Sequence, residues 1–139
     1  MTDLQCVTPN EENPSETPLI GRPYAFGIFD CFSFVHDYMY QIMNIEIGQL
    51  ERTEQCFDIP GFTRDAAIQC GFVQVYDAPR RGDLFLIQTE VGEPDHAAVY
   101  DGNDRIMHHM RNRLSRSDIY GGSYWQLHTI SHWRHKVLC

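Results

Sequence analysis

The sequence predicts a single α+β domain in which one long helix comes before a set of antiparallel strands. The first observation is a helical pattern of apolar residues that starts after residue 30. The second is a series of short apolar runs, separated by turn residues, from residue 84 to the end of the chain. A helical layer followed by strands with tight connections is typical of the α+β class. The length of 139 residues suits one domain with its own hydrophobic core.

Residues 1–20 are expected to form a flexible N-terminal arm ahead of a folded domain at residues 21–139. The arm is rich in Pro, Glu, Asn and Thr, a composition that buries too little apolar surface to form a core. It also lacks the basic start and apolar run of a signal peptide, so we expect synthesis in a reducing cytoplasm. No apolar stretch of the chain has the length of a membrane span.

The expected long helix covers residues 31–44 and places a cysteine in its first turn. Asp30 is a residue type that caps helix N-termini, and apolar residues follow at helical spacing, namely Phe32, Val35, Met39 and Ile42. In a first turn, unpaired backbone N–H groups and the helix dipole favour a thiolate, which makes Cys31 a candidate nucleophile. The alternative is that Cys31 only fills space in the core, as free cysteines often do.

The remaining elements follow in order along the chain. A short helix is predicted at residues 64–69, ending near Gly71, and an extended segment comes after it. A turn at residues 81–83 opens a strand at residues 84–89. The stretch "DHAAVYDGNDRIMHHM" predicts a hairpin around residues 101–104, and "YWQLHTI" and "WRHKVLC" predict one or two closing strands.

The hairpin brings histidines from two strands together. His96 begins its first strand, and His108 and His109 end its second. A turn centred on residues 102 and 103 places His96 opposite His109, whereas a bulge in the turn places His108 there instead. A cysteine nucleophile needs a base and a third group that orients the base. Cys31, His96 and one of the two following histidines supply these groups; the alternative is that the histidines are surface residues at strand ends.

Composition and cysteine count exclude several other classes of protein. The formal net charge of −8 argues against a nucleic-acid-binding role. Five widely spaced cysteines, an odd number, do not form the pattern of a disulfide framework. No C-x-x-C motif or other structural zinc spacing is present, so we expect no metal site.

The segments "PYAFG", "DC", "RRGDLFLI" and "DHAAVYDGNDRIMHH" occur in the order that characterises the NlpC/P60 family of cysteine peptidases, which this chain resembles over residues 21–139. The stretch "RLSRSDIYGGSYW" is similar to the phage tail-assembly branch of that family. The resemblance implies a papain-like domain whose nucleophile helix packs on an antiparallel sheet. It assigns Cys31 as nucleophile and His96 as general base. It also assigns His108, twelve residues later, as the third polar residue, and Tyr24 as a neighbour of the thiol.

The same resemblance implies the reaction and its setting. We expect hydrolysis of an amide in the peptide stem of bacterial peptidoglycan, at the D-γ-glutamyl–diamino acid bond, without a cofactor. Arg111 and Arg113 follow the histidines and are candidates for binding the substrate carboxylate. The protein is expected to be made in the bacterial cytoplasm and to act from a virion tail, beside other tail-tip proteins. Two alternatives are a structural tail-tip assembly protein with little or no hydrolase activity and a delivered antibacterial amidase toxin.

Overall fold

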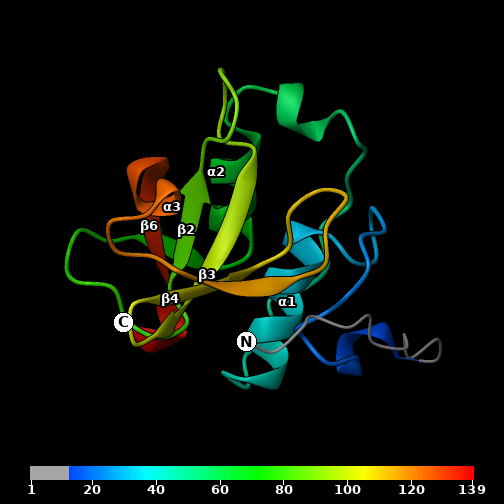
Figure 1. Ribbon diagram of the computed structural model, residues 1–139, viewed down its shortest axis with the longest axis horizontal. Helices are drawn as coiled ribbons and strands as arrows, with labels where there is room; N and C mark the ends of the chain where they lie inside the picture. The colour runs from blue at the N-terminus through cyan, green and yellow to red at the C-terminus, as the bar shows by residue number, and fades with distance from the viewer. Residues whose placement is uncertain (1–12) are drawn as a thin grey trace.

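A computed structural model describes residues 13–139 and contains one six-stranded antiparallel sheet with helices packed around it (Figure 1). The sheet order is β1-β6-β2-β3-β4-β5. The strands are β1 (Phe72–Gln74), β2 (Leu84–Ile87), β3 (His96–Gly102), β4 (Arg105–His108), β5 (Arg116–Ile119) and β6 (Thr129–His135). The α-helices are α1 (Cys31–Gln41), α2 (Phe62–Gln69) and α3 (Tyr124–Leu127), and 3₁₀ turns occur at Pro14–Glu16, Cys56–Asp58 and Lys136–Leu138. The predicted α+β fold class is confirmed.

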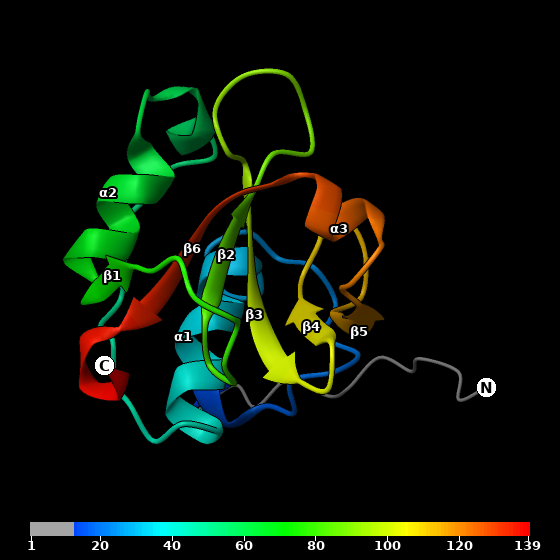
Figure 2. The ribbon, with the colours of Figure 1, turned by 90° about the vertical axis from the view of Figure 1, so that its left-hand side faces the viewer.

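Helix α1 lies against one face of the sheet, where its apolar side chains form the main core (Figure 2). Asp30 caps the helix, because its carboxylate accepts a hydrogen bond from the Ser33 N–H at 2.9 Å. One turn later the buried stripe begins with Phe34, Tyr38 and Met39. These side chains pack against residues that share one face of the central strands, including Leu84, Leu86, Ala97 and Val99. The cap therefore sets where α1 begins, and the apolar stripe sets which face of α1 meets the sheet.

A second, smaller core covers the opposite face of the same strands. Phe85 and Ile87 alternate with the residues that face α1, so β2 is buried on both sides. Phe85 stacks on Tyr120 with ring centroids 4.3 Å apart, and Trp125 from α3 packs against this cluster. Helix α3 and Tyr120, which follows the edge strand β5, thus form a layer over this face that the sequence pattern did not predict.

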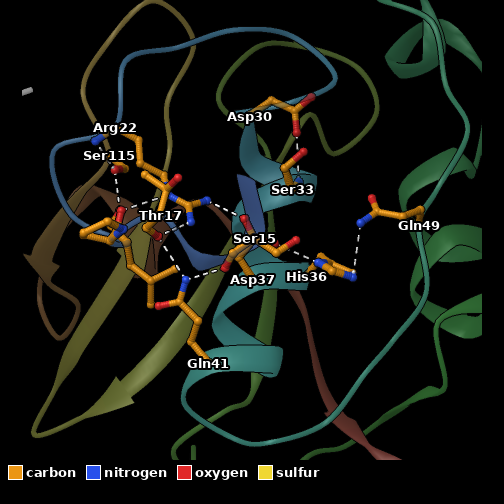
Figure 3. A network of polar contacts seen from close by, with 12 residues as sticks. Ser15, Thr17, Arg22, Asp30, Ser33, His36, Asp37, Gln41, Gln49 and Ser115 are labelled. Carbon is orange, nitrogen blue, oxygen red and sulfur yellow. Dashed lines mark hydrogen bonds and ion pairs between the residues drawn. The ribbon is translucent and has the colours of Figure 1, made fainter. Parts of the chain in front are cut away.

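The segment before α1 is held by a buried arginine (Figure 3). Arg22 is fully buried, and its guanidinium contacts the Asp37 carboxylate and the Thr17 carbonyl oxygen, each at 2.6 Å. Its backbone N–H donates to the Ser115 hydroxyl at 2.8 Å. Gln41, at the end of α1, also donates a hydrogen bond to the Thr17 carbonyl oxygen. Residues 13–20 of the expected arm therefore pack on α1. Residues 1–12 of the expected arm lie outside the described residues.

Several element boundaries differ from those predicted. Helix α1 ends at Gln41 rather than near residue 44, α2 begins at residue 62 rather than 64, and β2 ends at residue 87 rather than 89. Residues 124–127 form a helix, not the predicted strand, because the Ser123 side chain accepts hydrogen bonds from the Trp125 and Gln126 N–H groups. Residues 129–135 form a single closing strand, where the sequence predicted one or two.

Candidate active site

A cleft of about 310 Å³ lies at the N-terminal end of α1 and the start of β3. It brings together most of the side chains that the sequence indicated. Its lining includes Tyr24, Cys31, His96, His109 and Arg111, along with the carboxylates of Asp30, Glu54, Asp58, Glu90 and Asp95. The cysteine side of the cleft comes from α1 and the histidine side from the β3–β4 hairpin.

Cys31 is the first residue of α1 and is buried beside the start of β3. The backbone N–H of Ala97, the residue after His96, lies beside the Cys31 sulfur. Burial raises the pKa of the Cys31 thiol to about 12, and the Asp30 carboxylate acts in the same direction. Burial and Asp30 therefore oppose the thiolate that the helix N-terminus favours. Burial outweighs the helix N-terminus, so a nucleophilic Cys31 would need a base to take its proton.

The positive charge of Arg52 balances the negative charge of Asp30, the residue before Cys31. One nitrogen of its guanidinium contacts both oxygens of Asp30 at 2.7 Å and the Ser33 hydroxyl at 3.0 Å. The guanidinium carbon also lies 5.1 Å from the centroid of the Phe32 ring. Sequence reasoning missed Arg52 because it lies in an irregular segment with no periodic signal. Its charge reduces the unfavourable effect of Asp30 on ionisation of Cys31.

His96 contacts His108, and the bulged register of the hairpin explains why. The register of β3 and β4 shifts between Tyr100 and Gly102, so that His108 pairs with Ala98 rather than with His96 itself. The two histidines share a face and meet diagonally, with His96 Nε2 and His108 Nδ1 2.7 Å apart. The structure thus brings together the pair that the resemblance indicated. The expectation that they lie directly opposite each other is wrong by two residues.

The environment of His96 suits a neutral base. Burial lowers its pKa well below the ordinary value, and the neighbouring His108 and His109 lower it further. Its Nδ1 makes no hydrogen bond to any of residues 13–139, and Nε2 is occupied by His108. Trp125 covers this side of the site, with its ring 4.5 Å from the ring of His108. The imidazole therefore keeps one unoccupied nitrogen beside the cleft that holds Cys31.

Asp118 extends the line of contacts beyond the two histidines. His108 Nε2 donates to Asp118 Oδ2 at 2.6 Å, and Arg116 Nε donates to the same oxygen at 2.8 Å. Partial burial raises the pKa of Asp118, but these two donors dominate and lower it to about 2. Sequence reasoning missed Asp118 because the polar stretch "RSDI" has no apolar alternation. The polar strand directly after the histidine strand was the available signal.

Tyr24, His109 and Arg111 form one wall of the cleft. The Tyr24 ring contacts the His109 ring edge-on at 5.6 Å, and the Arg111 guanidinium lies beside the Tyr24 hydroxyl. Partial burial raises the pKa of Tyr24, so its hydroxyl keeps its proton. His109 is buried and donates from Nε2 to the Arg113 carbonyl oxygen at 2.9 Å. It reaches the cleft although it follows His108 directly, because β4 ends at His108 and strand alternation stops there.

The two arginines proposed for the substrate carboxylate lie in different places. Arg111 lines the cleft, whereas the exposed side chain of Arg113 is not part of the lining. Among residues 13–139, no three His, Cys, Asp or Glu side chains are grouped so as to hold a metal ion. No helix in this part of the chain is both long and apolar enough to cross a membrane.

Comparisons with known proteins agree with this geometry. Residues 21–134 match the NlpC/P60 family. The chain is 31% identical to tail tip assembly protein K of Escherichia phage N15, over 96% of this chain and 54% of that protein. It is also 31% identical to tail tip assembly protein K of Escherichia phage lambda, over 86% of this chain and 60% of that protein. The chain therefore spans a little over half the length of the curated relatives it matches.

Two solved structures share the fold. One is a protein similar to a lipoprotein of the NLP/P60 family from Staphylococcus aureus subsp. aureus Mu50, with a TM-score of 0.55 and 22% identity, covering 84% of this chain and 37% of that one. The other is the NlpC/p60 domain of the peptidoglycan hydrolase SagA, with a TM-score of 0.51 and 20% identity, covering 84% of this chain and 89% of that one. With the family match over residues 21–134, these findings show that the chain belongs to the NlpC/P60 family.

Proposed function

We propose that the protein is a phage tail-associated cysteine peptidase that hydrolyses an amide bond in the peptide stem of bacterial peptidoglycan. The observation that carries the proposal is the shared cleft of Cys31 and His96, with His108 behind the base. The proposed bond is the one between D-γ-glutamate and a diamino acid. Membership of the family and the peptidoglycan hydrolase among the structural neighbours support this substrate class.

In the proposed mechanism, the thiol loses its proton as it attacks. The Sγ–H bond of Cys31 breaks, the proton passes to His96 Nδ1, and Sγ bonds to the carbonyl carbon. Backbone N–H groups of the first turn of α1, together with the Tyr24 hydroxyl, stabilise the oxygen that becomes negative. His96 then gives this proton to the amine as the C–N bond breaks, which leaves a thioester on Cys31. A water, deprotonated by the same Nδ1, attacks the thioester, the C–S bond breaks, and the proton returns from His96 to Sγ.

Charge in the cleft suggests how the substrate is oriented. A γ-linked glutamyl residue carries a free α-carboxylate, and Arg111 is the lining residue with a positive charge that suits it. The acidic side chains of Glu54, Asp58 and Glu90 line the same cleft and suit an amino group of the peptide. The exposed Arg113 is assigned no contact with substrate.

The relatives support a setting in the phage tail. Both are named tail tip assembly proteins, which fits a protein that acts from the virion tail beside other tail proteins. The second candidate function is tail assembly without hydrolysis. It is favoured by those names and by the raised pKa of Cys31, which leaves the thiol unreactive until a base takes its proton.

Incubation with purified muropeptides, followed by mass analysis of the products, tests the proposed function. We expect cleavage by the wild-type protein, none by Cys31→Ala and normal cleavage by Cys56→Ala. Cys56 is a matched control because it is a second buried cysteine. Intact muropeptides after incubation with folded wild-type protein would favour the assembly function. Cleavage by Cys31→Ala at the wild-type rate would exclude Cys31 as the nucleophile.

A further inference from the structure

We infer that Asp118 is a positioning residue that fixes the ring tautomers of His108 and His96. Its effect is to keep the Nδ1 lone pair of His96 free for the proton of Cys31. The inference rests on the proposed function for its catalytic meaning, but the tautomers themselves are properties of the resting protein.

The direction of the first hydrogen bond follows from the chemistry of a carboxylate. An ionised carboxylate only accepts hydrogen bonds, so His108 Nε2, 2.6 Å from Asp118 Oδ2, must carry a hydrogen. The second donor to that oxygen, Arg116 Nε, leaves the carboxylate ionised throughout the neutral range. A neutral His108 with its hydrogen on Nε2 has a bare Nδ1.

The second hydrogen bond follows from the first. In a neutral His108 Nδ1 is bare, so His96 Nε2, 2.7 Å away, must donate to it. Both rings are buried, with 3% of His96 and none of His108 exposed, so bulk water does not offer competing partners. A neutral His96 with its hydrogen on Nε2 has its lone pair on Nδ1. That is the nitrogen with no hydrogen bond to the described part of the chain.

The reverse arrangement would disable the site. If His108 carried its hydrogen on Nδ1, it would donate to His96 Nε2, and the hydrogen of His96 would move to Nδ1. His96 would then be unable to accept the thiol proton. In the working arrangement, the proton goes from Cys31 Sγ to His96 Nδ1 and no proton moves between the two imidazoles. The Asp118 charge then stabilises the imidazolium through two hydrogen bonds.

The test uses two variants and one matched control. Asp118→Ala removes the acceptor and leaves Arg116 as a donor near His108 Nε2, which favours the reverse arrangement. Asp118→Asn retains an oxygen acceptor for His108 Nε2. Because Arg116 Nε can only donate, the asparagine side chain should turn its amide oxygen toward Arg116 and His108. Ser117→Ala is the control, since Ser117 is the preceding residue of β5 and its hydroxyl bonds to Arg105 rather than to a histidine.

The main readout is ¹⁵N NMR of the histidine rings near neutral pH, which distinguishes protonated from bare ring nitrogens without substrate. In wild type, Ser117→Ala and Asp118→Asn, we expect both His96 and His108 to carry hydrogen on Nε2. In Asp118→Ala, we expect both rings to acquire hydrogen on Nδ1. A wild-type His96 or His108 with hydrogen on Nδ1 would overturn the inference, even if no variant folds.

Kinetics on muropeptides supply the second readout. We expect Asp118→Ala to lower kcat roughly 10²-fold with little change in KM, and Asp118→Asn to recover much of that loss. Unchanged tautomers and unchanged kcat in Asp118→Ala would also overturn the inference. If wild-type protein proves inactive, the proposed function fails, while the NMR spectra still decide whether Asp118 sets the tautomers.

Discussion

Two of the three histidine–aspartate pairs among residues 13–139 have similar local chemistry but lie in different regions of the molecule. His108 and Asp118 meet at 2.6 Å in the sheet, and His36 and Asp37 meet at 2.8 Å in α1. In each pair the aspartate also binds an arginine. The difference is the second ring nitrogen, which contacts another histidine in the first pair and the Gln49 amide in the second. Of these two pairs, only His108–Asp118 leads to the cleft, which is why we propose a chemical role for it alone.

The arginine partners show the same division. Arg22, the partner of Asp37, is fully buried and joins residues 13–22 to α1 (Figure 3). Arg116, the partner of Asp118, has 40% of its side chain exposed. In the α1 pair both histidine nitrogens and both aspartate oxygens contact protein groups, so we expect this pair to serve stability. The sheet pair contacts His96, the proposed base, which lines the cleft.

The largest expected effects on activity come from replacing His96 and His108, and His36 of the other pair serves as the comparison. His96→Ala should lower kcat/KM by about 10³-fold and His108→Ala by roughly 10²-fold or more, because the base or its support is lost. His36→Ala should leave kcat/KM within about twofold and lower the free energy of unfolding by about 1–3 kcal/mol, since buried partners lose hydrogen bonds. Steady-state kinetics on muropeptides and urea denaturation measure these effects. A catalytic loss in His36→Ala as large as that in His108→Ala would remove the distinction between the pairs.

The next largest effect concerns the arginine partners. Arg22→Ala should cost about 3–5 kcal/mol of folding stability, because it breaks a buried ion pair and leaves Asp37 without its cation. Arg116→Gln should cost less than about 1 kcal/mol, as is usual for exposed pairs. Denaturant midpoints of the two variants measure the difference. Equal costs would mean that Arg22 contributes no more to the fold than a surface residue.

The pH dependence of alkylation compares Cys31 with Cys56, a buried cysteine outside the proposed chemistry. With its pKa raised to about 12, the Cys31 thiolate fraction grows with pH throughout the neutral and mildly alkaline range. Its reaction with iodoacetamide should accelerate about tenfold per pH unit between roughly pH 7 and 10. Peptide mapping by mass spectrometry follows both sites in one sample. A plateau for Cys31 near pH 7 would mean that the resting form is a thiolate after all.

The smallest expected effect concerns substrate binding. Arg111→Gln should raise KM about fivefold, with little change in kcat, because a positive charge in the cleft is lost. Arg113→Gln is the matched control and should change neither value, since its side chain lies outside the cleft lining. The KM effect of Arg111→Gln should shrink as ionic strength rises. A larger effect from Arg113 than from Arg111 would place the substrate carboxylate elsewhere.

The sequence predicted those parts of the fold and site that carry strong local signals. The Asp30 cap, the apolar stripe of α1 and the "DGND" turn were enough to place Cys31 at a helix start and His96 at a strand start. The stretch "RSDI" had no apolar period, and with β5 unpredicted, Asp118 was missed. The raised pKa of the Cys31 thiol could not be predicted from the sequence either, because it depends on how deeply tertiary packing buries this side chain.

The central claim, that Cys31 attacks a stem-peptide amide with His96 as its base, is tested most directly by looking for the thioester. Wild-type protein in excess is mixed with muropeptide, quenched in acid after short times, digested and mapped by mass spectrometry. We expect a transient acyl adduct on the peptide that contains Cys31, at a rate that matches amine release, and a much slower adduct in His96→Ala. Amine release without any adduct on Cys31, or adduct formation at the wild-type rate in His96→Ala, would contradict the claim.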